Sequence, residues 1–147
     1  MTDPNTDAAN AELKAWYKEI LDNVVKEMIR TEIITGAAVE ASPVWAVPHE
    51  LLIAKVWPAT RKSQFVWTIA GQDWITDHIR GSMASNPKDA ARHFSLKWQM
   101  DADRMLNLAK TKAPDSNTRA NVEAVANKLI HQAESLYELV ERGTGWQ

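Results

Sequence analysis

The chain has 147 residues, no cysteine and a formal net charge of -2. It therefore forms neither disulfides nor thiolate metal sites, and a charge this close to neutral argues against binding nucleic acids or anionic membranes. The polar N-terminus lacks the apolar core of a signal peptide, and no stretch is apolar for long enough to cross a bilayer, so we expect a cytoplasmic protein.

Residues 1–7 are polar and acidic, and we expect them to form a disordered tail before a single α+β domain that spans residues 8–147. After this tail, apolar side chains recur at steps of three and four residues, which is typical of an amphipathic helix. We place this long N-terminal helix from Ala8 to Thr35, because Gly36 offers a stop. Its apolar stripe consists of Leu13, Tyr17, Ile20, Val24 and Met28.

Residues 43–70 predict a small antiparallel β-sheet of two to three strands. Pro43 and Pro48 bracket a short apolar run, and because each proline lacks a backbone donor, a strand there is restricted to an edge. Residues 50–57 and 64–70 are apolar and β-branched runs joined by a short polar loop, which is the pattern of a hairpin. Nearly every position in both runs is apolar, so we expect both faces of the sheet to be covered.

Two helices are predicted after a connection that spans residues 71–85. Asn86 and Pro87 form a helix start, and the helix should end before Pro114. Asp115 or Ser116 caps the last helix, which continues to Gly143. We expect an antiparallel helix pair packed on the sheet. The predicted buried stripes are Ala91, Phe94, Trp98, Met105 and Leu108, then Val122, Val125, Leu129, Ala133, Leu136 and Val140.

Four of the seven tryptophans, Trp45, Trp57, Trp67 and Trp74, lie within one stretch of thirty residues. A cluster this dense forms either a heavy core or an aromatic binding surface. Trp57 and Trp67 belong to the predicted hairpin, where we expect them to hold the sheet to its helices. Trp45 and Trp74 lie at the margins of the sheet and are candidates for binding.

Polar side chains are concentrated in residues 71–78, directly after the second hairpin strand. A loop at the end of a strand is where a rigid scaffold presents functional groups. Together with the marginal tryptophans, this loop supplies the predicted binding residues, which are Trp45, Trp74, Thr76, Asp77 and His78. The alternative stays open that Asp77 and Thr76 only satisfy the backbone donors of a turn.

No catalytic residue, no metal site and no cofactor is predicted. The sequence lacks the phosphate-binding, dinucleotide-binding, zinc-protease and nucleophile-elbow motifs. Asp89 and His93 are four residues apart on a predicted helix, but no third ligand motif accompanies them. Basic side chains do not interleave with the tryptophans as they do in proteins that bind single-stranded nucleic acids.

Residues 43–98 resemble an uncharacterised bacterial family of domains of unknown function, whose pattern reads roughly W-x-V-x-P, a tryptophan-rich strand, I-x-G-D-x-P-T-D-Y, H-P-x-x-A and a helical tryptophan. The loop at residues 71–78 departs from the family, because it is longer by one residue and lacks the proline. Thr76 and Asp77 match, whereas His78 replaces the aromatic residue. The resemblance implies a single bacterial domain with a special loop, and it supplies no reaction. Its matching segments are residues 43–48, 55–57, 66–71, 75–79, 86–87, Ala90 and Trp98.

The lack of a catalytic motif favours a non-enzymatic protein-interaction module of the inhibitor, immunity or adaptor type. Such a module would bind a protein partner through the tryptophan-bearing sheet edge and the loop at residues 71–78. The alternative is a small-molecule-binding or hydrolytic domain, with Asp77 and a histidine in an aromatic pocket. A homodimer through the C-terminal helix is a third interpretation, because its apolar stripe is widened by Ile130, Tyr137 and Leu139.

Overall fold

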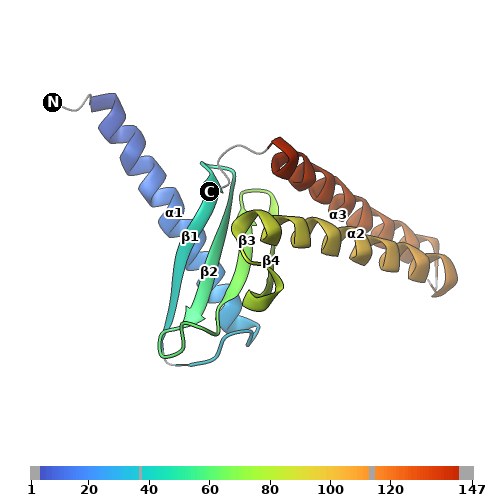
Figure 1. Ribbon diagram of the computed structural model, residues 1–147. Helices are drawn as coiled ribbons and strands as arrows, with labels where there is room; N and C mark the ends of the chain where they lie inside the picture. The colour runs from blue at the N-terminus through green and yellow to red at the C-terminus, as the bar shows by residue number, and fades with distance from the viewer. Residues whose placement is uncertain (1–3, 37, 113–114, 143–147) are drawn as a thin grey trace. The chain divides into compact units, whose positions relative to one another are not determined.

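The computed structural model describes residues 4–36, 38–112 and 115–142. The chain divides into two compact units, one ending at Met83 and one beginning at Ala84. The first unit contains a long helix and a four-stranded antiparallel sheet, and the second contains two helices (Figure 1). The predicted α+β class is confirmed, whereas the prediction of two to three strands is wrong. The packing of the helix pair on the sheet stays a prediction.

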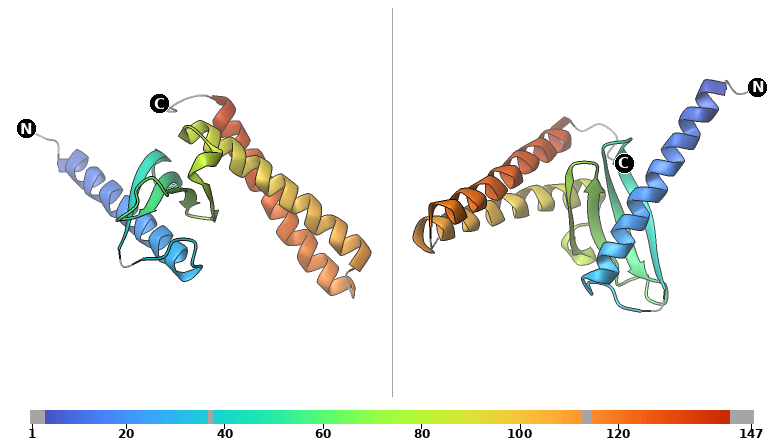
Figure 2. Two further views of the ribbon diagram at one scale, coloured as in Figure 1. Left: turned by 60° about the horizontal axis from the view of Figure 1, so that its bottom comes forward. Right: turned by 180° about the vertical axis from the view of Figure 1, so that it is seen from behind.

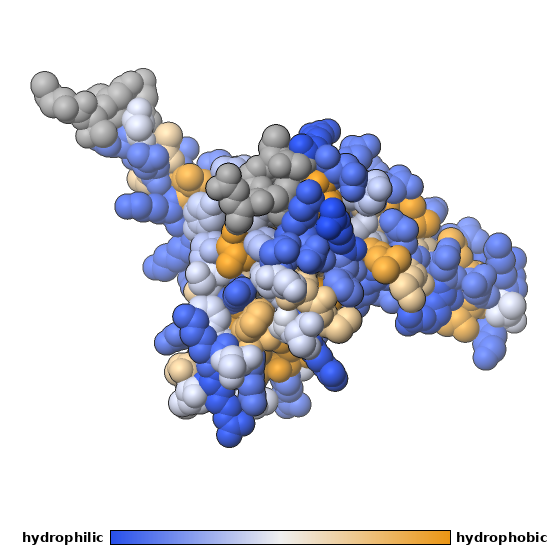
Figure 3. Space-filling view, viewed as in Figure 1, coloured by the Kyte–Doolittle hydropathy of each residue, from blue (hydrophilic) through white to orange (hydrophobic). Residues whose placement is uncertain are grey.

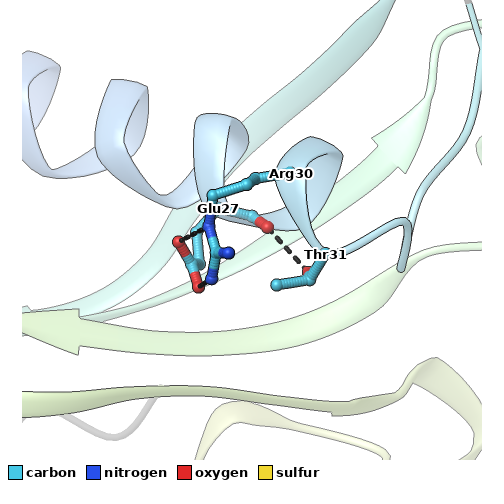
Figure 4. A network of polar contacts seen from close by, with 3 residues as sticks. All are labelled: Glu27, Arg30 and Thr31. Atoms are coloured by element: carbon cyan, nitrogen blue, oxygen red, sulfur yellow. Dashed lines mark hydrogen bonds and ion pairs between the residues drawn. The ribbon is translucent and has the colours of Figure 1, made fainter.

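Helix α1 (Pro4–Arg30) begins four residues earlier than predicted and ends five residues earlier. Its end is marked by a polar network (Figure 4), in which Arg30 Nη2 donates to Glu27 Oε1 at 2.6 Å and Thr31 Oγ1 donates to the Glu27 carbonyl at 2.7 Å. The hydrogen bond from Arg30 lowers the pKa of Glu27. Glu32 then adopts a φ of 59°, which no right-handed helix contains. Residues 31–35 therefore leave the helix, and most of them are β-branched.

The sheet consists of β1 (Val39–Val47), β2 (Leu51–Pro58), β3 (Val66–Gly71) and β4 (Trp74–Arg80), in the order β1-β2-β3-β4. The predicted hairpin is confirmed as β2 and β3. The short apolar run predicted between Pro43 and Pro48 forms the C-terminal part of β1. The strand itself starts at Val39, four residues before Pro43. Every neighbouring pair is antiparallel, so β1 and β4 are the two edge strands.

The predicted connection at residues 71–85 contains the strand β4, so that prediction is wrong. A tight turn at Gln72 and Asp73 reverses the chain at once, and Asp73 has a φ of 63°. Aspartate is one of the few residues that adopt this conformation at low cost. Gly71 is required beside it, because a Cβ there would collide with the backbone carbonyl of Glu50. A three-residue 3-10 helix, Gly81–Met83, follows β4.

Helix α1 covers one face of the sheet (Figure 2). Trp16, Val24 and Met28 of α1 are buried against this face. Trp16 extends the predicted apolar stripe of the helix, because it lies four residues before Ile20. Full burial of a side chain of this size contributes about 1.5–3 kcal/mol, so these residues hold the helix to the sheet. On the central strands β2 and β3, the residues packed with them are even-numbered, because side chains alternate between the two faces of a sheet. These residues are Leu52, Ala54, Val56 and Ala70.

The second unit is an antiparallel hairpin of α2 (Pro87–Lys112) and α3 (Ser116–Arg142). Ser95 Oγ donates to the Ala133 carbonyl at 2.8 Å across the buried seam. Leu108 and Val125, which were predicted to be buried, are about half exposed, because alanines occupy the seam instead. Apolar side chains consequently lie among polar ones on the surface of this hairpin (Figure 3). The buried residues of the two helices are Ala90, Ala91, Phe94, Ser95, Trp98, Ala102, Ala109, Ala126, Leu129, Gln132, Ala133, Leu136 and Val140.

Both helix starts agree with the sequence. The side chain of Asn86 accepts the backbone N–H of Asp89 at 2.8 Å, and that of Asp115 accepts the N–H of Thr118 at 2.6 Å. These are N-caps, which satisfy backbone donors that have no partner within the helix. The hydrogen bond from the Thr118 backbone lowers the pKa of Asp115. None of the described helices combines the length and apolar character that a bilayer span requires.

Candidate binding site

The four clustered tryptophans lie on one face of the sheet, opposite the face covered by α1. Side chains alternate between the faces along a strand, and directly paired residues share a face. Trp57 and Trp67 are odd-numbered residues of strands whose even-numbered residues contact α1. Trp45 and Trp74 join the same face because they pair with Ile53 and Gly71. All four tryptophans of the cluster therefore lie on the same face of the sheet.

Trp57 and Trp67 are buried on this face, whereas Trp45 and Trp74 are partly buried at its two edges. The indole of Trp57 donates to Glu40 Oε2 at 3.0 Å, and that of Trp67 donates to the Gly81 carbonyl at 3.1 Å. Both side chains are buried on the face opposite α1, and the expectation that they hold the sheet to its helices stays a prediction. Trp45 and Trp74 lie at the margins as predicted, but on opposite edge strands.

The five predicted site residues do not form one cluster. Trp45 and Asp77 belong to a cross-strand row in which Trp45 pairs with Ile53, Ile53 with Ile69, and Ile69 with Asp77. They are thus at opposite ends of a row that is four strands wide. His78 pairs with Thr68, which places it on the other face, toward α1, and Thr76 is exposed.

The side chains of Asp77 and His78 are consequently directed to opposite faces of the sheet. The Asp77 carboxylate instead accepts the backbone N–H of His78 at 2.7 Å. Gly81 N–H donates to the Phe65 carbonyl at 3.0 Å. This bond shows which residues of β4 direct their backbone N–H and C=O groups toward β3, because such residues alternate along an antiparallel strand. By alternation from that bond, the N–H of His78 points away from the sheet. Asp77 therefore occupies a donor on the outer edge of β4.

The other edge strand, β1, differs between its two halves. Ala59 N–H donates to the Ala38 carbonyl at 3.0 Å. Since hydrogen-bonded residues alternate along an antiparallel strand, the backbone N–H and C=O groups of Glu40 and Ser42 are directed toward β2. The N–H groups of Val39 and Ala41 then point outward. Pro43, whose nitrogen also points outward, has no donor to offer, and a register shift follows it.

The open half of β1 borders a groove of about 500 Å³ between this strand and α1. Its floor is apolar, and a row of charged side chains runs along its rim with one residue in each helical turn. Unpaired backbone donors beside an apolar groove can receive an extended polypeptide. The groove is lined by Lys18, Leu21, Asp22, Val25 and Lys26 from α1, and by Val39 and Ala41 from β1.

A second hollow, of about 400 Å³, lies between the segment that follows α1 and the β2–β3 loop. It is lined by Ile33, Ile34, Thr35, Pro58, Thr60, Arg61 and Gln64, and no open strand edge borders it. Within residues 4–36, 38–112 and 115–142, no three histidine, aspartate or glutamate side chains are grouped to hold a metal ion.

Sequence reasoning missed the groove residues of α1. Lys18, Asp22 and Lys26 follow one another at four-residue steps, a spacing that is visible in the sequence but is also typical of any solvated helix face. Only the pairing of β1 with β2 shows which strand edge this face borders. On α3, Tyr137 is exposed and Ile130 and Leu139 are half buried, so self-association through this helix stays a prediction.

No curated protein and no solved structure matches the chain. Residues 10–146 match the sequence family described as a domain of unknown function, DUF4826. This match covers both compact units, and it agrees with the resemblance to an uncharacterised family that residues 43–98 indicated. The chain belongs to the DUF4826 family.

Proposed function

We propose that this domain is a non-enzymatic protein-interaction module that binds an extended segment of a partner polypeptide along the edge strand β1. The observation that carries the proposal is the groove between α1 and β1, which lies beside the outward N–H groups of Val39 and Ala41. A strand added there would pair with β1 and insert alternate side chains into the groove. This edge strand is the one that carries Trp45, but the partner would pair with its N-terminal half, whereas Trp45 lies in the C-terminal half.

The contrast between the two edges supports this choice. On β4 the carboxylate of Asp77 occupies the N–H of His78, and the register shifts between Ile69 and Gly71. Natural proteins protect sheet edges with such charged side chains, bulges and prolines. On β1, Pro43 and the register shift after it protect only the second half. The first half of β1 is left competent for pairing.

The alternative of a small-molecule or hydrolytic site around Asp77 gains no support from this arrangement. Its carboxylate and the His78 side chain are directed to opposite faces of the sheet, and the groove lies at the far edge. The loop at residues 71–78 contributes instead to the protection of β4. An inhibitor, immunity or adaptor protein would use such an open strand to bind one partner.

Panning a library of extended peptides against the full chain tests the proposal. We expect selected peptides to protect the amide protons of Val39 and Ala41 from hydrogen exchange. Ala41→Pro removes one outward donor without removing a bond to β2, and it should weaken binding about fivefold, the value of one backbone hydrogen bond. Ala41→Ser keeps the donor and serves as the matched control. Peptides that protect only other amides, or that bind Ala41→Pro unchanged, would contradict the proposal.

A further inference from the structure

We infer that the hollow between the segment after α1 and the β2–β3 loop binds a small hydroxylated carboxylate through the guanidinium of Arg61. The hollow has a volume of about 400 Å³, which lies in the range of small-molecule sites. Of the described residues that line it, only Arg61 is charged. The hollow and the groove beside β1 share no lining residue, so this site goes beyond the proposed strand addition.

Backbone hydrogen bonds fix both walls of the hollow. On the side of α1, the N–H of Ile34 donates to the Met28 carbonyl at 3.2 Å, and both side chains belong to the core. On the other side, the N–H of Arg61 donates to the Pro58 carbonyl at 2.9 Å. The carbonyl of Arg61 accepts the N–H of Gln64 at 3.0 Å, so the backbone of Arg61 is held by two successive turns. A site whose walls are fixed before the ligand arrives loses less conformational entropy on binding.

The guanidinium of Arg61 makes no ion pair or hydrogen bond with another residue in the described part of the chain. The next residue, Lys62, differs, because its ammonium lies 5.1 Å from the centre of the Trp57 ring. A cation in this position is attracted to the face of the ring. The two cations of the loop are therefore used differently, and that of Arg61 is available to a ligand in the hollow.

The charge of the lining favours a carboxylate over a phosphate. A guanidinium presents its donors in a planar fork, which binds either anion through two parallel hydrogen bonds. The single positive charge of Arg61 balances one carboxylate. A phosphate ester carries close to two negative charges at neutral pH, so part of its charge would have no partner in the hollow.

The uncharged polar side chains of the lining fit hydroxyl groups of the ligand. The hydroxyls of Thr35 and Thr60 and the amide of Gln64 can both donate and accept hydrogen bonds. None of these three side chains is hydrogen-bonded to another described residue. Ile33 and Pro58 offer apolar contact to a short carbon chain. A sugar acid combines the three features that this lining can bind, which are a carboxylate, several hydroxyls and a carbon chain.

NMR titration of the isotope-labelled full chain with three probes tests the inference. Gluconate carries one carboxylate, sorbitol is its neutral counterpart, and glucose 6-phosphate carries a phosphate instead. We expect gluconate to bind tightest and to shift the backbone amides of residues 33–36 and 59–64. Loss of one charge-assisted hydrogen bond lowers affinity about tenfold, so this is the expected difference between gluconate and sorbitol.

Arg61→Gln should weaken gluconate binding about tenfold and remove the preference over sorbitol. The matched control is Lys62→Gln, which makes the same change of net charge in the same loop and should leave binding unchanged. Arg61→Lys retains the charge without the planar fork, and its affinity should be intermediate. Both residues are exposed, and circular dichroism and urea midpoints would verify that the variants are folded.

Three results would overturn the inference. The first is that gluconate binds no more tightly than sorbitol or glucose 6-phosphate, and the second is that it shifts only amides outside residues 33–36 and 59–64. The third is equal weakening by Arg61→Gln and Lys62→Gln, which would indicate a nonspecific attraction of anions. Strand addition at β1 is measured separately by the protection of Val39 and Ala41, so either proposal can fail without the other.

Discussion

The carboxylate of Asp77 accepts the backbone N–H of the next residue, His78, at 2.7 Å on the outer edge of β4. This contact gives a structural role to a residue that the sequence marked as a candidate for ligand binding. An edge donor that is already satisfied cannot pair with another strand, so this contact removes the N–H of His78 from the donors that β4 can offer.

Replacement of Asp77 by alanine should destabilise the protein and expose the β4 edge. The lost hydrogen bond is partly buried, and its removal should cost about 1 kcal/mol in a urea titration. Light scattering should also detect self-association that the wild type lacks. Asp77→Asn retains a side-chain oxygen and should remain closer to the wild type. Wild-type behaviour of the alanine variant in both measurements would disprove this role.

The indoles of Trp16 and Trp57 should respond differently to replacement by phenylalanine. Trp16 Nε1 is buried without a hydrogen-bond partner, beside the tilted ring of His49, whose centroid is 5.8 Å away. Trp57 Nε1 donates to Glu40. Trp57→Phe should therefore lower the free energy of unfolding by about 1 kcal/mol, while Trp16→Phe removes an unsatisfied donor and should change it less. Chemical denaturation compares the two, and a larger loss for Trp16→Phe would show that its N–H has a partner.

The cap formed by Asp115 should make the stability of α3 depend on pH. The pKa of this carboxyl is lowered, chiefly by the hydrogen bond from the Thr118 backbone. The folded state therefore binds the proton less tightly than the unfolded state does, so the stabilisation is present above the ordinary aspartate pKa of about 4 and is lost as the pH falls below it. Asp115→Asn should lack this contribution to the acid transition. Identical acid unfolding curves for the two proteins would contradict the assignment.

Gly71→Ala should be among the most destabilising small substitutions in the sheet. The new methyl group would collide with the backbone carbonyl of Glu50, which also accepts the N–H of Gln72 at 3.1 Å. Overpacking of this kind costs about 1–3 kcal/mol, because the backbone rather than a flexible side chain must move. Thermal unfolding measures the loss. A variant with the wild-type midpoint would show that the β3–β4 turn adjusts freely.

Most elements could be predicted from local patterns. The helical period locates α1, α2 and α3, and the β-branched runs locate β2 and β3. The strand β4 was missed because Thr76, Asp77 and His78 interrupt its apolar residues, and the turn before it contains only Gln72 and Asp73. The seam of the helix pair was misplaced at Leu108 and Val125, because both apolar and small residues satisfy a helical period and only contact decides which are buried.

The sequence by itself determined the α+β class, the helix cap at Asn86, a second cap at either Asp115 or Ser116, and the tryptophan-rich hairpin, because each depends on residues that are close together in the chain. Tertiary structure alone decided that all four clustered tryptophans share one face and that Asp77 and His78 face apart, since both depend on strand pairing. It also decided which strand edge the groove borders. That edge depends on the register of β1 against β2 and on the position of α1 beside it, and neither is encoded in a local pattern.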